Sequence, residues 1–457
     1  MIHLLADIIV NVIYEKTNID VYWLKQMMYY LLLFAGIISF YLSIKIFNKD
    51  RLFGITFVIL QIYIYIPFAA RIYDSNLVDI VSHIQINDES TLINYILFCY
   101  VFNLILFFLS KILRFKREVN KYAFIPNDKL KKNLVFYNII QFLVGFYLWY
   151  YLLINYSQLS YYNQQIVKTN TIWCIALEYS FVFSFINYLV YKDKGNTAKQ
   201  KFFSIGLGLM LILPSIITQL KIGSRGIAMP AIIGILYTIV EKKDIKISLF
   251  QLKKLFIPLL IILLIIASSQ FVRNNRGDKV DNFSFSLIDV WSFFDVSVFL
   301  FQDYTVPGNS LMYCMENRII DPLFVCKSNI GNGLFFLDAP TIAEQISDFI
   351  ADGENFGVGG FIPVEGYYFA GWLGCLLLPF VIICFYRFYY SFLFVKCDTQ
   401  FNTFMGFLLC TFVSMNLARG QTYFLFKVLY MYIIPCVVLY IIAIGRLKFN
   451  NAYVESQ

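Results

Sequence analysis

The chain has 457 residues and a net charge of +8, yet only 14% of its residues are charged while 59% are hydrophobic. Soluble proteins carry roughly 25% charged residues, so nearly half of the charge expected of a soluble chain is missing. The mean hydropathy is +0.67, and runs such as "LIILLIIASSQF" leave no polar helix face for water. The composition therefore excludes a soluble globular protein and predicts an all-α polytopic integral membrane protein.

Apolar runs along the chain predict eleven membrane spans, since a hydrocarbon layer of about 30 Å needs roughly 20 apolar helical residues per crossing. These spans are residues 27–47, 52–70, 91–113, 134–154, 172–191, 202–220, 226–240, 255–271, 367–386, 401–416 and 422–445. The spans at 226–240 and 401–416 are short, so they are expected to tilt less or to end inside the protein. Residues 1–20 are expected to form an interfacial helix on the outer face, with a twelfth crossing as the alternative. They show no cleavable signal pattern.

The distribution of Lys and Arg predicts the orientation, because cytoplasmic connections carry an excess of these residues. The basic connections alternate along the chain and are predicted to face the cytoplasm, as is the C-terminus: 45–51, 115–133, 191–201, 241–254, 387–396 and 446–448. The other connections are predicted to face outward: 71–90, 155–171, 221–225, 272–366 and 417–421. This pattern divides the chain into an N-terminal bundle (1–271), a large outer loop (272–366) and C-terminal helices (367–457).

Three outward connections carry an Arg-Gly pair, against the general bias of basic residues toward the cytoplasm: Arg225-Gly226, Arg276-Gly277 and Arg419-Gly420. The planar guanidinium binds a phosphate through two parallel hydrogen bonds, and a following Gly lets backbone N–H groups approach the ligand. A helix that starts after Gly226 adds the positive end of its dipole. The pattern favours an anion site, with Arg273 and Lys221 as weaker candidates. The alternative is that these cations only extend from helix ends toward water.

The large outer loop holds 13 of the 29 acidic residues of the chain against five Lys and Arg. A structureless loop of this length is unusual, so helices are expected at 284–304, along the membrane surface, and at 338–357. Aromatic rings, carboxylates and amides together suit the binding of sugars. A protective cap over the helical bundle is the alternative.

Cysteine and histidine usage limits the chemistry. Cys314 and Cys326 lie in the outer loop and are candidates for a disulfide, since outer compartments are oxidising. The only histidines are His3 and His83, and neither C-x-x-C nor H-E-x-x-H spacing occurs, so no metal site is predicted. No nucleotide-binding glycine loop is found on the cytoplasmic side, which disfavours an ATP-driven pump. No cofactor and no nucleic-acid partner are predicted.

Three stretches carry a resemblance to a known family: "GSRGIAMP" (223–230), "VEGYYFAGWLG" (364–374) and "NLARGQTYFLF" (416–426). With the large loop between late spans, the layout resembles the Wzy-type O-antigen or oligosaccharide repeat-unit polymerases of the bacterial inner membrane over nearly the whole chain. The Arg-x10-Gly pattern of some members does not occur after Arg225.

The resemblance implies a GT-C-like, metal-independent glycosyltransferase. Such an enzyme transfers a glycan from undecaprenyl diphosphate to the non-reducing end of another lipid-linked repeat unit at the outer face of the membrane. Membrane lipid and a chain-length regulator protein would be its further partners. The arginines Arg225, Arg276 and Arg419 would then bind the diphosphate and stabilise its departure.

The acceptor hydroxyl needs a general base, and with no histidine in 272–366 a carboxylate is expected. Glu365 is the first candidate, followed by Asp303 and Asp278; an ion pair with an arginine or a cap for the helix expected at Tyr367 is the alternative role for Glu365. Three other functions compete with a polymerase. An O-antigen ligase would use a histidine in the large loop. A lipid-linked oligosaccharide flippase and a scaffold subunit are the remaining alternatives.

Overall fold

A computed structural model of the chain describes residues 21–73, 89–112, 123–126, 134–157, 159, 171–191, 198–222, 228–242, 362–393, 399–414, 417, 428–444 and 447–450. Apart from one small sheet, the secondary structure of these residues is helical. Six of the described helices are long and apolar enough to cross a membrane. The prediction of an α-helical membrane protein is confirmed at this level, whereas the number of eleven spans and the GT-C-like fold stay predictions.

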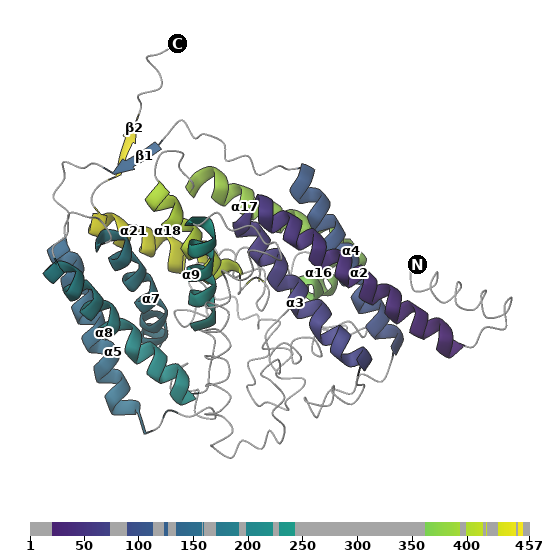
Figure 1. Cartoon of the computed structure of the whole chain (residues 1–457), viewed down its shortest axis with the longest axis horizontal. Coiled ribbons are helices and arrows are strands. Elements are labelled where there is room, and N and C mark those ends of the chain that lie inside the picture. The colour runs from purple at the N-terminus through teal and green to yellow at the C-terminus, as the bar shows by residue number, and fades with distance from the viewer. Residues whose placement is uncertain are drawn as a thin grey trace, which may run out of the picture.

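Seven long helices form most of the bundle (Figure 1). They are α2 (Val21–Lys49), α3 (Arg51–Tyr73), α4 (Glu89–Ile112), α5 (Leu134–Asn155), α7 (Thr171–Tyr191), α8 (Ala198–Ile222) and α17 (Gly374–Leu393). Continuous apolar sequence favours helices in lipid because every backbone hydrogen bond is then made within the segment. A tight turn joins α2 to α3, where Asp50 caps α3 by accepting a 3.1 Å hydrogen bond from the backbone N–H of Phe53.

The remaining helices are much shorter. Helix α9 covers Ala228–Lys242 and α16 covers Ile362–Ala370. Helix α18 (Thr399–Leu409) continues into the π-helical turn η5 (Cys410–Ser414), and the π-helical turn η6 (Leu429–Ile433) leads into α21 (Ile434–Ile444). Helix α9 has 15 residues and therefore rises only ~22 Å, less than the ~30 Å of a hydrocarbon layer.

Helices occupy every predicted span except 255–271, which lies outside the described residues. One prediction needs correction. The span expected at 367–386 is two helices, because α16 begins at Ile362 and the turn η4 (Gly371–Leu373) separates it from α17. Gly371 has a φ of +56°, a left-handed conformation that ends α16 and that glycine adopts at little cost. Residues 1–20, the helices expected at 284–304 and 338–357, and the pair Cys314 and Cys326 lie outside the described part of the chain.

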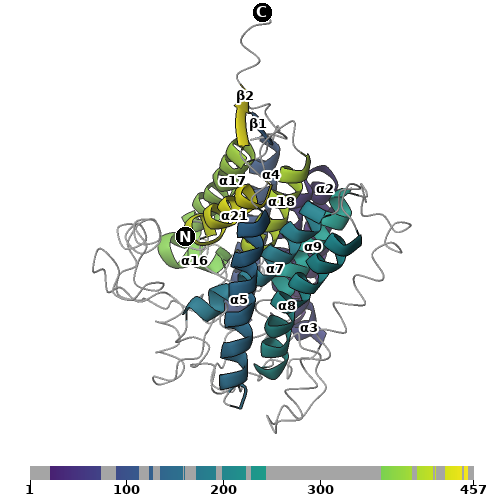
Figure 2. The ribbon, with the colours of Figure 1, turned by 90° about the vertical axis from the view of Figure 1, so that its left-hand side faces the viewer.

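Two short strands form an antiparallel sheet that is not among the predicted elements. Strand β1 (Ala123–Pro126) pairs with β2 (Leu447–Asn450), with Ala123 opposite Asn450 and Pro126 opposite Leu447. The pairing joins two connections, 115–133 and 446–448, that both belong to the predicted cytoplasmic set. The sheet lies at the top of Figures 1 and 2, beyond the helix ends.

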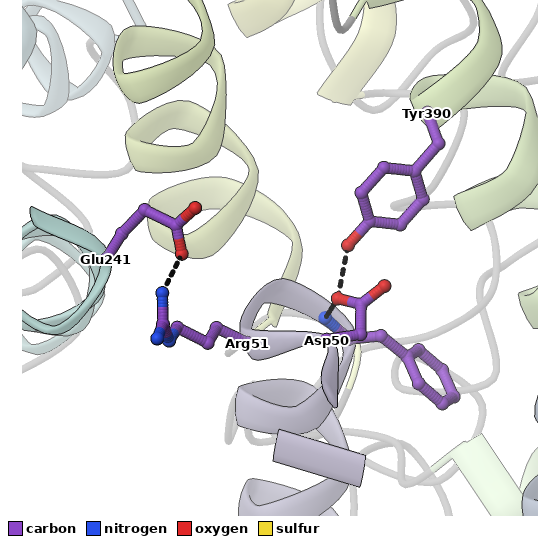
Figure 3. A network of polar contacts seen from close by, with 5 residues as sticks. Asp50, Arg51, Glu241 and Tyr390 are labelled. Carbon is purple, nitrogen blue, oxygen red and sulfur yellow. Dashed lines mark hydrogen bonds and ion pairs between the residues drawn. The ribbon is translucent and has the colours of Figure 1, made fainter. Parts of the chain in front are cut away.

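Other predicted cytoplasmic connections meet in a polar network (Figure 3). Arg51 Nη1 donates to Glu241 Oε2 at 2.8 Å, and the Tyr390 hydroxyl donates to Asp50 Oδ1. These residues come from the α2–α3 turn, the end of α9 and the last part of α17. The ends of these described helices therefore lie close together. Which side of the membrane this end faces stays a prediction.

The segment α18–η5 lies inside the bundle, where it packs closely against α9. A Cβ atom on Gly234 of α9 would lie 2.2 Å from Thr411 Oγ1, and one on Gly406 of α18 would lie 2.1 Å from the Tyr237 ring. Residues 400–414 include no exposed side chain. Small residues at such positions let membrane helices approach closely.

Candidate functional site

The three stretches singled out in the sequence all adjoin the short helices. "GSRGIAMP" lies between the end of α8 and the beginning of α9, and "NLARGQTYFLF" lies between η5 and η6. "VEGYYFAGWLG" covers most of α16, the turn η4 and the first residue of α17. Interrupted helices inside a bundle are a common way to build a polar site at membrane depth, because the interruption is shielded from lipid.

Helices α9 and α18–η5, which adjoin the first two stretches in sequence, pack against each other. Gly406 contacts Tyr237 near the end of α9, while Thr411, farther along η5, contacts Gly234, which lies nearer the start of α9. The two helices are therefore antiparallel. Their described ends, Ala228 and Ser414, are the ends that lead toward Arg225 and Arg419.

Aromatic contacts join the two π-helical turns to each other and to α7. The rings of Phe412 in η5 and Tyr432 in η6 stack at 4.2 Å, and Tyr432 stacks on Tyr179 of α7 at 6.2 Å. The Tyr179 hydroxyl donates a hydrogen bond to the carbonyl oxygen of Met431. This bond ties α7 to a π-helical turn, a feature that is frequent at functional sites.

Hydroxyl groups from α3 and α17 form hydrogen bonds at the end of η5. Thr56 Oγ1 on α3 donates to Ser414 Oγ at 2.8 Å, and the Tyr386 hydroxyl of α17 hydrogen-bonds to the same threonine. All three side chains are buried. Hydrogen bonds between membrane helices contribute about 0.6–2 kcal/mol each, so this group fixes the end of η5 against α3 and α17.

Glu365 lies in the first turn of α16 and is 4% exposed. Two aromatic residues of the same stretch, Tyr367 and Trp372, pack against Phe98 of α4 at 5.3 and 5.4 Å between ring centroids. A carboxylate in a first helical turn is stabilised by the helix dipole. The predicted cap of a helix starting at Tyr367 is wrong, because Glu365 belongs to a helix that begins three residues before it. Its proposed role as a base is not tested by this geometry.

Lys221 lies in the last turn of α8, with its Nζ atom 4.6 Å from the ring centroid of Tyr156, which follows α5. Lys45 and Lys111, at the opposite end of the bundle, lie in the same way over Tyr41 and Phe107. Lysines in such positions are common at membrane boundaries. Lys221 thus lies in a structural environment shared with lysines that have no predicted function.

The other predicted site residues lie outside the described residues: Arg225, Arg273, Arg276, Arg419, Asp278 and Asp303. Their grouping into one site therefore stays a prediction. Of the candidates that the structure describes, Glu365 packs on the α4 side of the bundle and Lys221 on the α5 side. Figures 1 and 2 both show α16 and α8 on different sides of the molecule.

The structure draws attention to one carboxylate that the sequence analysis missed, Glu178. It lies in the apolar part of α7 (Ile175–Val190), directly before Tyr179; its side chain is partly exposed, and its Oε2 atom is buried. Acidic residues inside transmembrane segments are rare and usually functional. The signal was present in the sequence as a single charge within the apolar run "TIWCIALEYSFVFSF".

Comparison with known proteins identified no relative of the chain: no family model, curated protein or solved structure matches it.

Proposed function

We propose that this protein is a polymerase of lipid-linked oligosaccharide repeat units that works at the outer face of a bacterial inner membrane. Its substrates would be glycans on undecaprenyl diphosphate, and its product an O-antigen or capsule-type polysaccharide. A chain-length regulator is the expected protein partner. Catalysis would need neither a metal ion nor another cofactor.

The observation that supports this proposal most strongly is the arrangement of the short helices. The helix ends that lead to Arg225 and Arg419 belong to α9 and α18–η5, which are packed together. Because the end of η5 is buried within the bundle, a charged substrate group beside it would be bound in a low-dielectric environment. Hydrogen bonds to charge are stronger in such an environment than in water.

The proposed reaction requires three kinds of group. Cations would bind the diphosphate and stabilise the charge that develops on it as the glycosidic bond breaks. An acidic and aromatic surface, for which the loop 272–366 is the candidate, would bind the sugars. A carboxylate would accept the proton of the attacking hydroxyl. Glu365, Asp303 and Asp278 are the candidates predicted from sequence.

Transport is the second candidate function, since interrupted helices also form the binding sites of many transporters. A flippase would move the lipid-linked glycan without changing its length. A ligase would transfer the glycan to a different acceptor, and the absence of histidine from 272–366 disfavours it.

The test of the proposal is chain extension by the purified protein in liposomes that contain a lipid-linked repeat unit. Neither nucleotide nor an ion gradient is supplied. A polymerase converts single repeat units into a ladder of longer lipid-linked chains, which electrophoresis resolves. Movement of unchanged units between leaflets, without extension, would support the flippase instead. In cells, loss of a polymerase leaves a single repeat unit on the acceptor core, whereas loss of a ligase leaves none.

A further inference from the structure

We propose that Glu178 is the carboxylate that accepts the proton of the attacking sugar hydroxyl in this reaction. The inference rests on the proposed function and names a residue outside the set predicted from sequence. It depends on where α7 places Glu178 relative to the two interrupted helices.

The register between α7 and α18 gives the level of Glu178 in the bundle. Gln400 donates a 2.9 Å hydrogen bond to the carbonyl oxygen of Leu189, and Phe185 stacks on Phe407 at 4.0 Å. The two helices are therefore antiparallel. Glu178 precedes Phe185 by seven residues, which is two helical turns, so both side chains lie on the same face of α7.

A step of seven residues from Phe407 likewise reaches the end of the described part of α18–η5. Ser414, the last residue of η5, follows Phe407 by seven residues. Glu178 is thus level with the end of η5, on the face of α7 that carries the contact with α18. The adjacent Tyr179 contacts Met431 and Tyr432 of η6, and Tyr432 in turn stacks on Phe412 of η5.

The environment of Glu178 differs from that of Glu365. Helix α16 and the turn η4 contact α4 and α17, through Phe98, Leu378 and Gly374. The register places Glu178 instead at the level of the end of η5, which itself packs on α9. Its Oε2 atom is buried within an apolar helix, and acidic residues inside transmembrane segments are usually functional.

The chemical step balances without a further reactant. The acceptor oxygen forms a bond to the anomeric carbon of the donor, and the bond from that carbon to the phosphate oxygen breaks. Its electron pair passes to the departing diphosphate. The proton of the hydroxyl passes to the Glu178 carboxylate and is later released to water.

The experiment compares the rate of chain extension by Glu178→Gln, Glu178→Asp and Glu365→Gln with that of the unmodified protein in the same liposomes. Ser180→Ala is the matched control, since Ser180 is a buried polar residue of the same helix whose hydroxyl donates to Leu177 O and contacts Ser215. Gln retains the size of Glu but cannot accept a proton. We expect Glu178→Gln to lower kcat by about 10²-fold or more, with little change in KM, and Ser180→Ala to extend chains normally.

Each outcome decides the inference. Extension by Glu178→Gln within about threefold of the unmodified rate overturns it, as does a loss of kcat confined to Glu365→Gln. If Glu178→Gln does not fold, Glu178→Asp decides: a folded Asp variant with an unchanged kcat contradicts the role, because the base has moved by a methylene length. A lowered kcat in that variant, with KM retained, supports the role. Failure of the unmodified protein to extend chains would instead reject the proposed function itself.

Discussion

Helix α5 and the segment α18–η5 show two different ways of building a membrane bundle. Helix α5 is a continuous helix of 22 residues, and only 28% of the residues in its most apolar window are buried. The segment α18–η5 combines 11 α-helical and 5 π-helical residues, and none of residues 400–414 is exposed. The long regular helix α5 thus faces the surroundings, while the short and irregular segment α18–η5 is enclosed by other helices.

This difference follows from the solvent. A helix that faces lipid must satisfy every backbone group internally, so a π-helical turn is tolerated only where neighbouring side chains supply partners. The Tyr179 hydroxyl donates a hydrogen bond to the carbonyl oxygen of Met431. Thr56, which is itself hydrogen-bonded to Tyr386, donates to the Ser414 hydroxyl. The interior of the bundle can therefore carry interrupted helices and polar groups that its periphery cannot. This is why we place the candidate site among the short helices.

The sharpest test of the comparison is the sidedness of the connections. Single cysteines in 115–133 and 241–254, introduced after the nine native cysteines are replaced, should be protected from membrane-impermeant thiol reagents added from outside. Cysteines in 280–360 should react almost completely, because that loop is predicted to face outward. Labelling is measured by a mass shift on gels of intact cells, with permeabilised cells as the control. Protection of 280–360 would reject the outer site and the proposed function together.

The arginine variants should give the next largest effect. Arg225→Ala, Arg276→Ala and Arg419→Ala are each expected to lower chain extension by about 10²–10³-fold, since a lost donor to developing charge costs on the order of 2–4 kcal/mol. Lys at these positions should restore only part of the rate, because a point charge cannot make the paired hydrogen bonds of a guanidinium. Arg273→Ala and Lys221→Ala should have smaller effects.

A matched control for these variants lies at the other end of the bundle. Arg387 on α17 is exposed and belongs to a predicted cytoplasmic connection, so Arg387→Ala should leave the rate unchanged. Electrophoresis of surface polysaccharide, at equal protein levels, measures each variant. Normal chain lengths in all three Arg-Gly variants would reject the diphosphate site.

The sequence predicted the peripheral helices better than the interior ones. Helix α5 was expected at 134–154 and is found at Leu134–Asn155, because an unbroken apolar run of about 20 residues is stable in lipid as one helix. The break between α16 and α17 follows from the left-handed backbone of Gly371, whereas the π-helical turns pack against other helices, which no local pattern encodes. Glu178 was missed for a related reason: a single charge in an apolar run gains meaning only once the register of α7 against α18 is known.

Glycine substitutions should separate the interior from the periphery by stability. A Cβ atom on Gly234 would lie 2.2 Å from Thr411 Oγ1 and 2.8 Å from the Phe407 ring, whereas Gly206 on α8 has no atom within 4 Å of that position. Gly234→Ala should therefore lower the free energy of unfolding by about 1–3 kcal/mol, and Gly206→Ala should not lower it. Thermal unfolding in detergent measures both. Equal stability of the two variants would contradict the close packing of α9 on η5.

The smallest expected effect concerns the ion pair between Arg51 and Glu241, whose side chains are 15% and 24% exposed. Each charge lies at the unfavourable end of its own helix: Arg51 begins α3 and Glu241 is in the last turn of α9. The pair offsets both unfavourable interactions, so removing one partner leaves the other charge opposed by a helix dipole.

Arg51→Gln and Glu241→Gln should each lower the free energy of unfolding by about 1 kcal/mol. The double variant should be more stable than either single variant, because both unfavourable charges are then gone. Losses that simply add in this double-mutant cycle would show that the 2.8 Å contact does not couple α3 to α9.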